Sequence, residues 1–164
     1  MALLAGAPSL AQELRAGIWQ RHDLRFQYLG FTTLYSCDGL VSKLRVLLKA
    51  SGARADLQVV EGSCTEIGGH PDRFAGARLV FHAFMPAAAD SSGSGLGAWR
   101  KVHIADGRPF DLSQGDCELV EQFRDLVLRK AFTTRNLTDR LVCVPHQGGR
   151  SFSLDFEVLV PTDP

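Results

Sequence analysis

Two similar stretches of the sequence decide the predicted fold: CDGLVSKLRVLL at residues 37–48 and CELVEQFRDLV at residues 117–127. They align with one single-residue gap, and both contain a cysteine, an acid, Leu-Val, an arginine and a closing apolar pair. Apolar residues recur in both at spacings of three and four, which is typical of an amphipathic helix. We therefore expect helices over residues 38–51 and 117–130.

The similarity between the two halves of the chain extends beyond these stretches. A second cysteine follows the first after 27 positions in one half (Cys37 to Cys64) and after 26 positions in the other (Cys117 to Cys143). A Gly-Gly pair follows each second cysteine, and each half closes on an apolar stretch that ends in proline, FHAFMP and FEVLVP. Features that recur in the same order predict an internal duplication.

Alternation of apolar and polar residues predicts three strands in each half. The expected strands are residues 24–33, 57–60, 78–85, 99–104, 137–144 and 152–160. Each half then has the order β-α-β-β. The stretch AAADSSGSGLGA at residues 87–98 is small, polar and rich in glycine, so we expect it to be a flexible connector.

The predicted fold class is α+β, built from a duplicated β-α-β-β unit. The first repeat spans residues 22–86 and the second spans residues 99–164. Two helices cannot cover both faces of six strands, so we expect them on one side of a mainly antiparallel sheet, related by a pseudo-twofold axis. A unit of about 65–75 residues buries little core alone, which predicts one compact domain with a shared core.

The four cysteines are predicted to form two structural disulfides, Cys37–Cys64 and Cys117–Cys143. A helix of about 13 residues advances ~20 Å, and the strand that returns covers a similar distance, which brings the second cysteine back beside the first. Each bridge closes a loop of about 27 residues and stabilises the fold by about 3–4 kcal/mol. Four cysteines allow three pairings, and four buried thiols in a cytosolic protein are the alternative.

Residues 1–21 form an N-terminal segment ahead of the first repeat. Its first eleven residues, MALLAGAPSLA, are apolar or small, with Ser9 and Ala11 where signal peptidase favours small residues. The stretch has no basic region and is interrupted by Pro8. We expect a remnant of a signal peptide to about residue 11 and a periplasmic or secreted protein. The alternative is a frayed segment that leads into a short helix of a cytoplasmic protein.

Composition limits the function. The chain has 164 residues with 18 Lys+Arg against 18 Asp+Glu, so it lacks the net positive charge that favours nucleic-acid binding. It has no run of ~18–20 apolar residues, and we expect no transmembrane segment. The spacings of zinc ligands, of a Cys-x-x-Cys motif, of a nucleophile elbow and of a phosphate-binding loop are absent. We therefore expect no metal, no cofactor and no catalytic residue.

Two loop histidines are the one recurring polar feature. His70 and His146 each lie in a loop that contains glycine or proline after a second cysteine. A small enzyme, or a ligand- or metal-binding protein, that uses these two loops is therefore an alternative. The acids Asp38, Asp116 and Glu118 fall at helix starts, where we expect them to cap the helices and complement the dipoles.

Three short motifs carry a resemblance to known proteins: YSCDGL at residues 35–40, GDCELV at residues 115–120 and CVPHQ at residues 143–147. With them the chain resembles a group of small, uncharacterised secreted proteins of proteobacteria with paired cysteines. The resemblance covers residues 22–161. Members of the group begin with a full signal peptide, whereas the one here is truncated. The resemblance implies export, but no activity, cofactor or partner.

The expected function follows from these observations. Paired cysteines, neutral charge and the lack of a convergent catalytic set predict an exported, disulfide-stabilised protein with a non-catalytic binding or envelope role, and an envelope protein as a candidate partner. A cytosolic domain with reduced cysteines is a further alternative.

Overall fold

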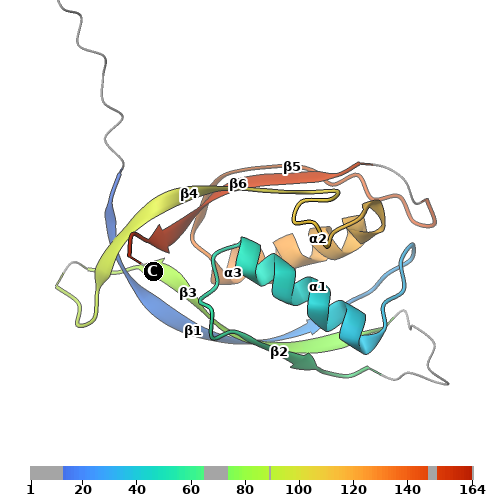
Figure 1. The fold of residues 1–164 in the computed structure, drawn as a ribbon, viewed down its shortest axis with the longest axis horizontal. Helices are drawn as coiled ribbons and strands as arrows, with labels where there is room; N and C mark the ends of the chain where they lie inside the picture. Colours follow the sequence, from blue (N-terminus) through green and yellow to red (C-terminus); the bar gives the residue numbers. More distant parts are fainter. Residues whose placement is uncertain (1–12, 65–73, 89, 148–150, 164) are drawn as a thin grey trace, which may run out of the picture.

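The computed structural model describes residues 13–64, 74–88, 90–147 and 151–163. Within them the protein is α+β, with two helical segments and a six-stranded antiparallel sheet of strand order β2-β3-β1-β4-β6-β5 (Figure 1). The strands are β1 (Arg15–Gln27), β2 (Gln58–Glu61), β3 (Gly76–Pro86), β4 (Gly95–Ala105), β5 (Thr134–Arg140) and β6 (Ser153–Pro161). The helices are α1 (Cys37–Ala50), α2 (Cys117–Phe123) and α3 (Arg129–Ala131), with a 3-10 turn η1 (Gln114–Asp116) and a π-helical turn η2 (Arg124–Leu128).

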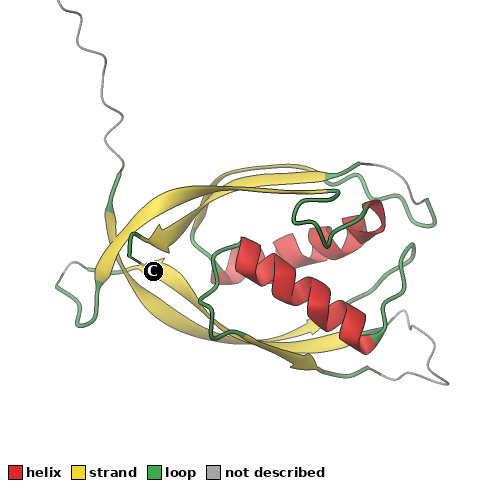
Figure 2. Ribbon diagram, viewed as in Figure 1, coloured by secondary structure: helices red, strands yellow, loops and turns green. Residues whose placement is uncertain are grey.

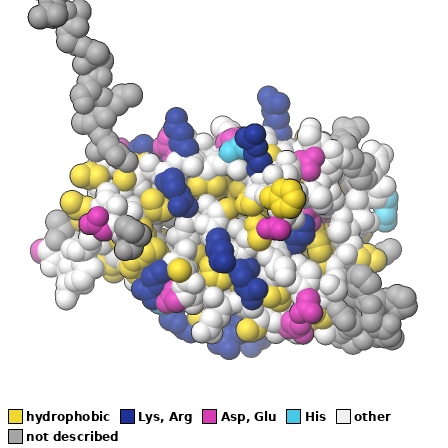
Figure 3. All heavy atoms as spheres, viewed as in Figure 1, with side chains coloured by type: hydrophobic (Ala, Val, Ile, Leu, Met, Phe, Trp, Pro, Cys, Tyr) yellow, Lys and Arg dark blue, Asp and Glu magenta, His cyan; other side chains and the backbone are white. Residues whose placement is uncertain are grey.

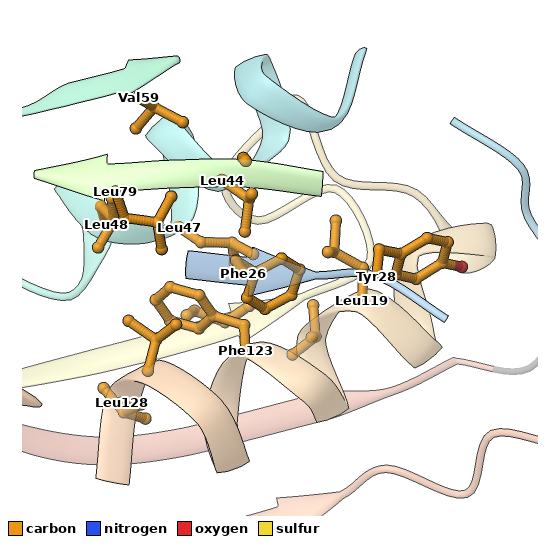
Figure 4. Packing of buried hydrophobic residues seen from close by; sticks show 14 of the residues in the cluster. Phe26, Tyr28, Leu44, Leu47, Leu48, Val59, Leu79, Leu119, Phe123 and Leu128 are labelled. Carbon is orange, nitrogen blue, oxygen red and sulfur yellow. The ribbon is translucent and has the colours of Figure 1, made fainter. Parts of the chain in front are cut away.

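The sheet curves around both helices, which lie together on its concave side (Figure 2). Inward-facing side chains of β1 and β3, such as Phe26 and Leu79, belong to one hydrophobic cluster with Leu44 of α1 and Phe123 of α2 (Figure 4). Each of these four side chains is at most 2% exposed. Burial of a side chain of this size contributes about 1.5–3 kcal/mol, so the shared core holds both halves together.

Helix α1 forms where the sequence predicts it. The Ser36 hydroxyl accepts a hydrogen bond from the Gly39 N–H at 3.1 Å, Asp38 lies in the first turn, and Lys49 lies in the last. These residues complement the helix dipole at both ends. The helix ends at Ala50, and Gly52 then takes a φ of +92°, a conformation that favours glycine.

The second helical segment runs from Cys117 to Ala131 as α2, η2 and α3 without a break. Its buried stripe matches that of α1 with one extra residue in the middle, and this residue falls in the π-helical turn. The stripe of α1 is Leu40, Val41, Leu44, Leu47 and Leu48, and the second stripe is Leu119, Val120, Phe123, Val127 and Leu128. A π-helical turn accommodates such an insertion without rotating the following residues out of the core.

Two strand boundaries differ from the prediction. The position expected for the first strand, residues 24–33, is wrong, because β1 begins at Arg15 and ends at Gln27. Residues 17–27 pair with β3 and residues 15–17 pair with β4. These pairings, which local alternation does not reveal, determine the length of the strand. The strand expected at residues 137–144 lies instead at β5, where Asn136 has a φ of +52° and the ladder to β6 contains a register shift.

The predicted flexible connector at residues 87–98 is also wrong in part. Its last four residues belong to β4, which pairs with β1 at Arg15, Ala16 and Gly17. A Cβ atom on Gly97 would lie 2.5 Å from Cε1 of Phe84, so this glycine permits close packing and does not supply flexibility.

The two halves of the sheet have the same strand order, β2-β3-β1 in one and β5-β6-β4 in the other, and they meet where β1 pairs with β4. The registers of β1 with β3 and of β4 with β6 also correspond. The corresponding cross-strand pairs are Gly17 with Pro86 and Trp19 with Phe84 in the first half, and Gly97 with Pro161 and Trp99 with Leu159 in the second.

Candidate functional site

Both disulfides predicted from the spacing are present. Cys37 is bonded to Cys64 and Cys117 to Cys143, with Cα–Cα distances of 5.9 Å and 5.6 Å. Each bridge ties the first residue of a helix to the chain beyond the strand that follows it. Because both helices begin at the same end of the molecule, both bridges lie there (Figure 1). We call this region, defined by the four cysteines, the disulfide end.

A loop of the first half, residues 28–35, is bound to helix α2 of the second half at the disulfide end. The Glu118 carboxylate accepts hydrogen bonds from the N–H groups of Phe31 and Thr32 at 2.9 Å and 3.0 Å. The Gln122 amide accepts from the N–H of Leu29 at 3.0 Å and donates to its carbonyl oxygen at 2.7 Å. Side chains of α2 thus satisfy backbone groups of a loop that lacks regular structure.

Asp116 forms the neighbouring part of this contact. Its carboxylate accepts hydrogen bonds from the Tyr35 hydroxyl, from Lys43 Nζ at 2.8 Å, and from the Ser113 N–H at 2.7 Å. Asp116 is 1% exposed, and burial together with this carboxylate raises the pKa of the Tyr35 phenol above its ordinary range. Several donors thus satisfy a carboxylate that is shielded from water.

The two buried acids only partly act as the sequence predicts. Asp116 closes a capping box with Ser113 over the 3-10 turn that precedes α2, which fits a capping role. Glu118 bonds the distant loop 28–35 instead, because the sheet brings the end of β1 beside the start of α2. The cavity next to Glu118 and the Cys117–Cys143 bridge has a volume of about 10 Å³, enough for about one water molecule and too small for a substrate. We interpret this network as a structural clamp.

The two predicted histidines have different outcomes. His70 lies outside the described residues. The N–H of His146 donates to Thr32 Oγ1 at 3.1 Å, and its ring lies edge-on to Phe31 with the ring centroids 6.2 Å apart. The structure thus places His146 against the clamped loop, in a left-handed backbone conformation with a φ of +62°.

The described part of the chain, residues 13–64, 74–88, 90–147 and 151–163, has neither a metal-binding cluster nor a membrane-spanning helix. No group of three or more His, Cys, Asp or Glu side chains there has a geometry that could hold a metal ion. No helix there is long and apolar enough to cross a membrane.

A tryptophan cluster on the convex face of the sheet was missed from the sequence. The guanidinium of Arg54 lies 5.6 Å from the ring centroid of Trp19, and that of Arg135 lies 4.3 Å from the centroid of Trp99. Phe84 packs between the strands at Gly17 and Gly97. The signal was a repeated motif, GIWQR at residues 17–21 and GAWRK at residues 97–101. The first copy falls in the N-terminal segment and the second overlaps the expected connector, so neither copy lies wholly inside a predicted repeat.

The convex face also carries two open grooves, one in each half. The first, of about 470 Å³, is lined by Arg25, Gln27, Arg78 and neighbouring residues of β2. The second, of about 450 Å³, is lined by Lys101, His103, Asp155, Glu157 and neighbours. These grooves are the candidate binding sites of the described residues, because they are open to solvent and lined by charged side chains.

Comparison of the chain with protein-family models, with curated proteins and with solved structures found no match. The resemblance to secreted proteobacterial proteins therefore stays a prediction.

Proposed function

We propose that this protein is exported and acts in the cell envelope or outside the cell by binding, without catalysing a reaction. The two disulfides carry this proposal. Such bridges persist in oxidising compartments and are rare in the cytosol. Each lies within one half and closes a loop of 27 or 26 residues, which is the arrangement expected of bridges that stabilise a small secreted fold.

The way in which the polar groups are used supports a binding role. Asp116 and Glu118, the two buried acids, are occupied by donors within the clamp. The charged side chains that face solvent line open grooves on a rigid sheet. Groups held on a strand are placed accurately for recognition.

We also infer that the two halves arose by duplication. Support comes from their equal strand order and from the equal registers of β1 with β3 and of β4 with β6. A pair of backbone hydrogen bonds corresponds as well: the Ala87 N–H donates to the Ala16 carbonyl at 3.0 Å, and the Thr162 N–H donates to the Leu96 carbonyl at 2.9 Å. These four residues flank the repeated motifs FHAFMP and FEVLVP, GIWQR and GAWRK. Repeated contacts of this kind are expected of two copies of one unit.

The export proposal is tested by intact mass spectrometry of the protein isolated from its native host, with thiol alkylation before and after reduction. The expected result is a chain that begins near Gln12 and has no reactive thiol until it is reduced. Alkylation of all four cysteines without reduction, in a chain that keeps Met1, would contradict export. That result would favour a cytosolic domain with reduced cysteines.

A further inference from the structure

We propose that the groove of the first half binds an oxyanion, the phosphate, sulfate or carboxylate group of a ligand, through Arg25 and Arg78. This inference rests on the binding role proposed above and names the chemistry of the ligand. Figure 3 shows Lys and Arg side chains gathered along the lower edge of the view, where β1 and β3 present their convex face.

The first argument is that two arginines face each other at this groove. Arg25 of β1 lies directly opposite Arg78 of β3 in the register. Like charges in facing positions destabilise a sheet, so such a pair has a cost unless a counter-charge is present. Asp23 supplies one negative charge, and its carboxylate accepts hydrogen bonds from Nε and Nη2 of Arg78 at 2.9 Å and 2.7 Å. Nη2 of Arg21 lies 3.5 Å from the same carboxylate.

Arg25 lacks such a counter-charge. Within the described part of the chain its guanidinium makes no hydrogen bond and no ion pair, although it lines the groove. Glu61 is the acid of the lining and belongs to the edge strand β2. A guanidinium fork that faces solvent in a concave site is well suited to bidentate contact with an oxyanion.

The second argument is the shape of the groove. Gly62 follows the last residue of β2, and Gly76 is the first residue of β3. The Gly62 N–H donates a hydrogen bond to the Gly76 carbonyl at 2.9 Å. A Cβ atom on either glycine would lie within 3.0 Å of backbone atoms of the adjacent segment. Gly62, which lines the groove, therefore carries no side chain, and the groove volume of about 470 Å³ is open beside the arginines.

The second half provides an internal comparison. Its groove has a similar volume, about 450 Å³, but acids there lie opposite the basic side chains in the register. Lys101 lies opposite Glu157 in the register, and His103 Nδ1 lies 2.6 Å from Asp155 Oδ1. The Glu157 carboxylate also contacts Arg135 Nε at 2.5 Å. The two grooves thus differ in their facing pairs: Lys101 faces an acid across the strands, whereas Arg25 faces another arginine.

The test is a titration of the full, oxidised chain followed by amide NMR shifts, at constant ionic strength. The probes are inorganic phosphate and inorganic sulfate, and vesicles of anionic or of zwitterionic phospholipid. We expect the amide signals of residues 25–27, 61–63 and 76–78 to shift together and to saturate. Saturation by phosphate supports a soluble oxyanion ligand, whereas a response to anionic vesicles alone supports a lipid headgroup as its source.

Substitutions decide whether the groove is specific. Arg25→Gln is expected to weaken phosphate binding about tenfold, since a charge-assisted hydrogen bond is lost. It should leave the thermal midpoint unchanged or raised, because it removes one of two facing like charges. Arg140→Gln, at an exposed arginine of β5 outside both grooves, is the matched control and should bind like the parent.

Two results would overturn the proposal. One is the absence of saturable shifts around the groove with every probe. The other is an equal loss of affinity in Arg25→Gln and Arg140→Gln, which would show diffuse attraction. Neither result touches the export proposal, which depends on the cleavage site and on the state of the thiols.

Discussion

At the scale of single residues, two carboxylates are buried and one imidazole is half-buried in the described part of the chain, and they are stabilised differently. Glu118 and Asp116 each accept several hydrogen bonds. His22 stacks on Phe81, with the ring centroids 5.3 Å apart, and its Nε2 atom is buried without a hydrogen-bond partner among the described residues. A satisfied buried anion stabilises the fold, whereas an unsatisfied polar atom costs about 1–3 kcal/mol.

Glu118→Gln is expected to destabilise the protein. Oε2 accepts from both N–H groups, those of Phe31 and Thr32, and Oε1 accepts from the Thr32 hydroxyl at 3.3 Å. A neutral amide loses one of these two acceptor oxygens, and its remaining charge-assisted bonds become ordinary ones. We expect a loss of about 1–3 kcal/mol in urea unfolding of the oxidised protein. Glu121→Gln, on the same helix, is the control and should change the unfolding free energy by less than about 0.5 kcal/mol. Equal effects of the two substitutions would contradict the clamp.

His22 is expected to make the fold sensitive to mild acid. Burial lowers the pKa of its imidazole below the ordinary value of 6.5, and the charge of nearby His82 lowers it further. The unfolded chain then binds a proton more readily than the folded one. The contribution of neutral His22 to stability is complete above pH ~6.5 and is lost as the pH falls from there toward the lowered pKa of the folded state.

The measurement is the thermal midpoint between pH 5 and pH 8 for the parent and for His22→Phe. Phenylalanine keeps the stacking on Phe81 and removes the titrating group, so the variant should be more stable by about 1 kcal/mol and flatter with pH. His146→Asn is the control, because asparagine tolerates a positive φ and His146 is exposed. An unchanged pH profile in His22→Phe would show that another group causes the acid sensitivity.

At the scale of elements, the contact between β1 and β4 depends on glycine. Gly17 and Gly97 both lie under Phe84, where a Cβ atom would approach its ring to 2.5 Å. Gly95, in the same strand β4, has open space around the equivalent position. Glycine is therefore required sterically at position 97, whereas position 95 has room for a side chain.

Gly97→Ala is accordingly expected to cost about 1–3 kcal/mol of unfolding free energy, because Phe84 and the strands must move apart. Gly95→Ala should be neutral or slightly stabilising, since it restricts the unfolded chain without a clash. Chemical denaturation of the two variants side by side makes the comparison. Equal losses in both would mean that strand propensity, and not the contact with Phe84, determines the cost.

At the scale of the whole molecule, the corresponding halves imply that the chain can be reconnected. Gly97 pairs with Arg15 on one side and with Pro161 on the other. The start of β1 and the end of β6 therefore lie about two strand spacings, ~10 Å, apart. A short linker from residue 162 to residue 14, with new ends in the β3–β4 turn at residues 87–94, would keep every strand pairing.

We expect this circular permutant to form both disulfides and to lose no more than about 1–2 kcal/mol of stability, because only loop closure changes. A permutant opened between Gly30 and Phe31, inside the clamped loop, is the control and should lose more. Near-ultraviolet circular dichroism and mass spectrometry of the oxidised proteins provide the readout. If both permutants behave alike, the clamp and the correspondence of the halves do not determine tolerance to reconnection.

The sequence by itself determined the features that depend on neighbours along the chain. Apolar spacing placed α1 and the second helical segment, and the reach of a helix and its return strand paired Cys37 with Cys64 and Cys117 with Cys143. These arguments succeed because period and contour length are properties of a continuous segment.

Only the tertiary structure decided which distant residues meet. The early start of β1, the contact of Glu118 with the loop 28–35, and the facing pair of Arg25 and Arg78 all follow from strand order and register. Strand order and register are not encoded in the alternation of one strand, because a hydrogen-bonded ladder takes its register from the partner that packs beside it. The candidate binding site therefore emerged only when the strands were assembled into a sheet.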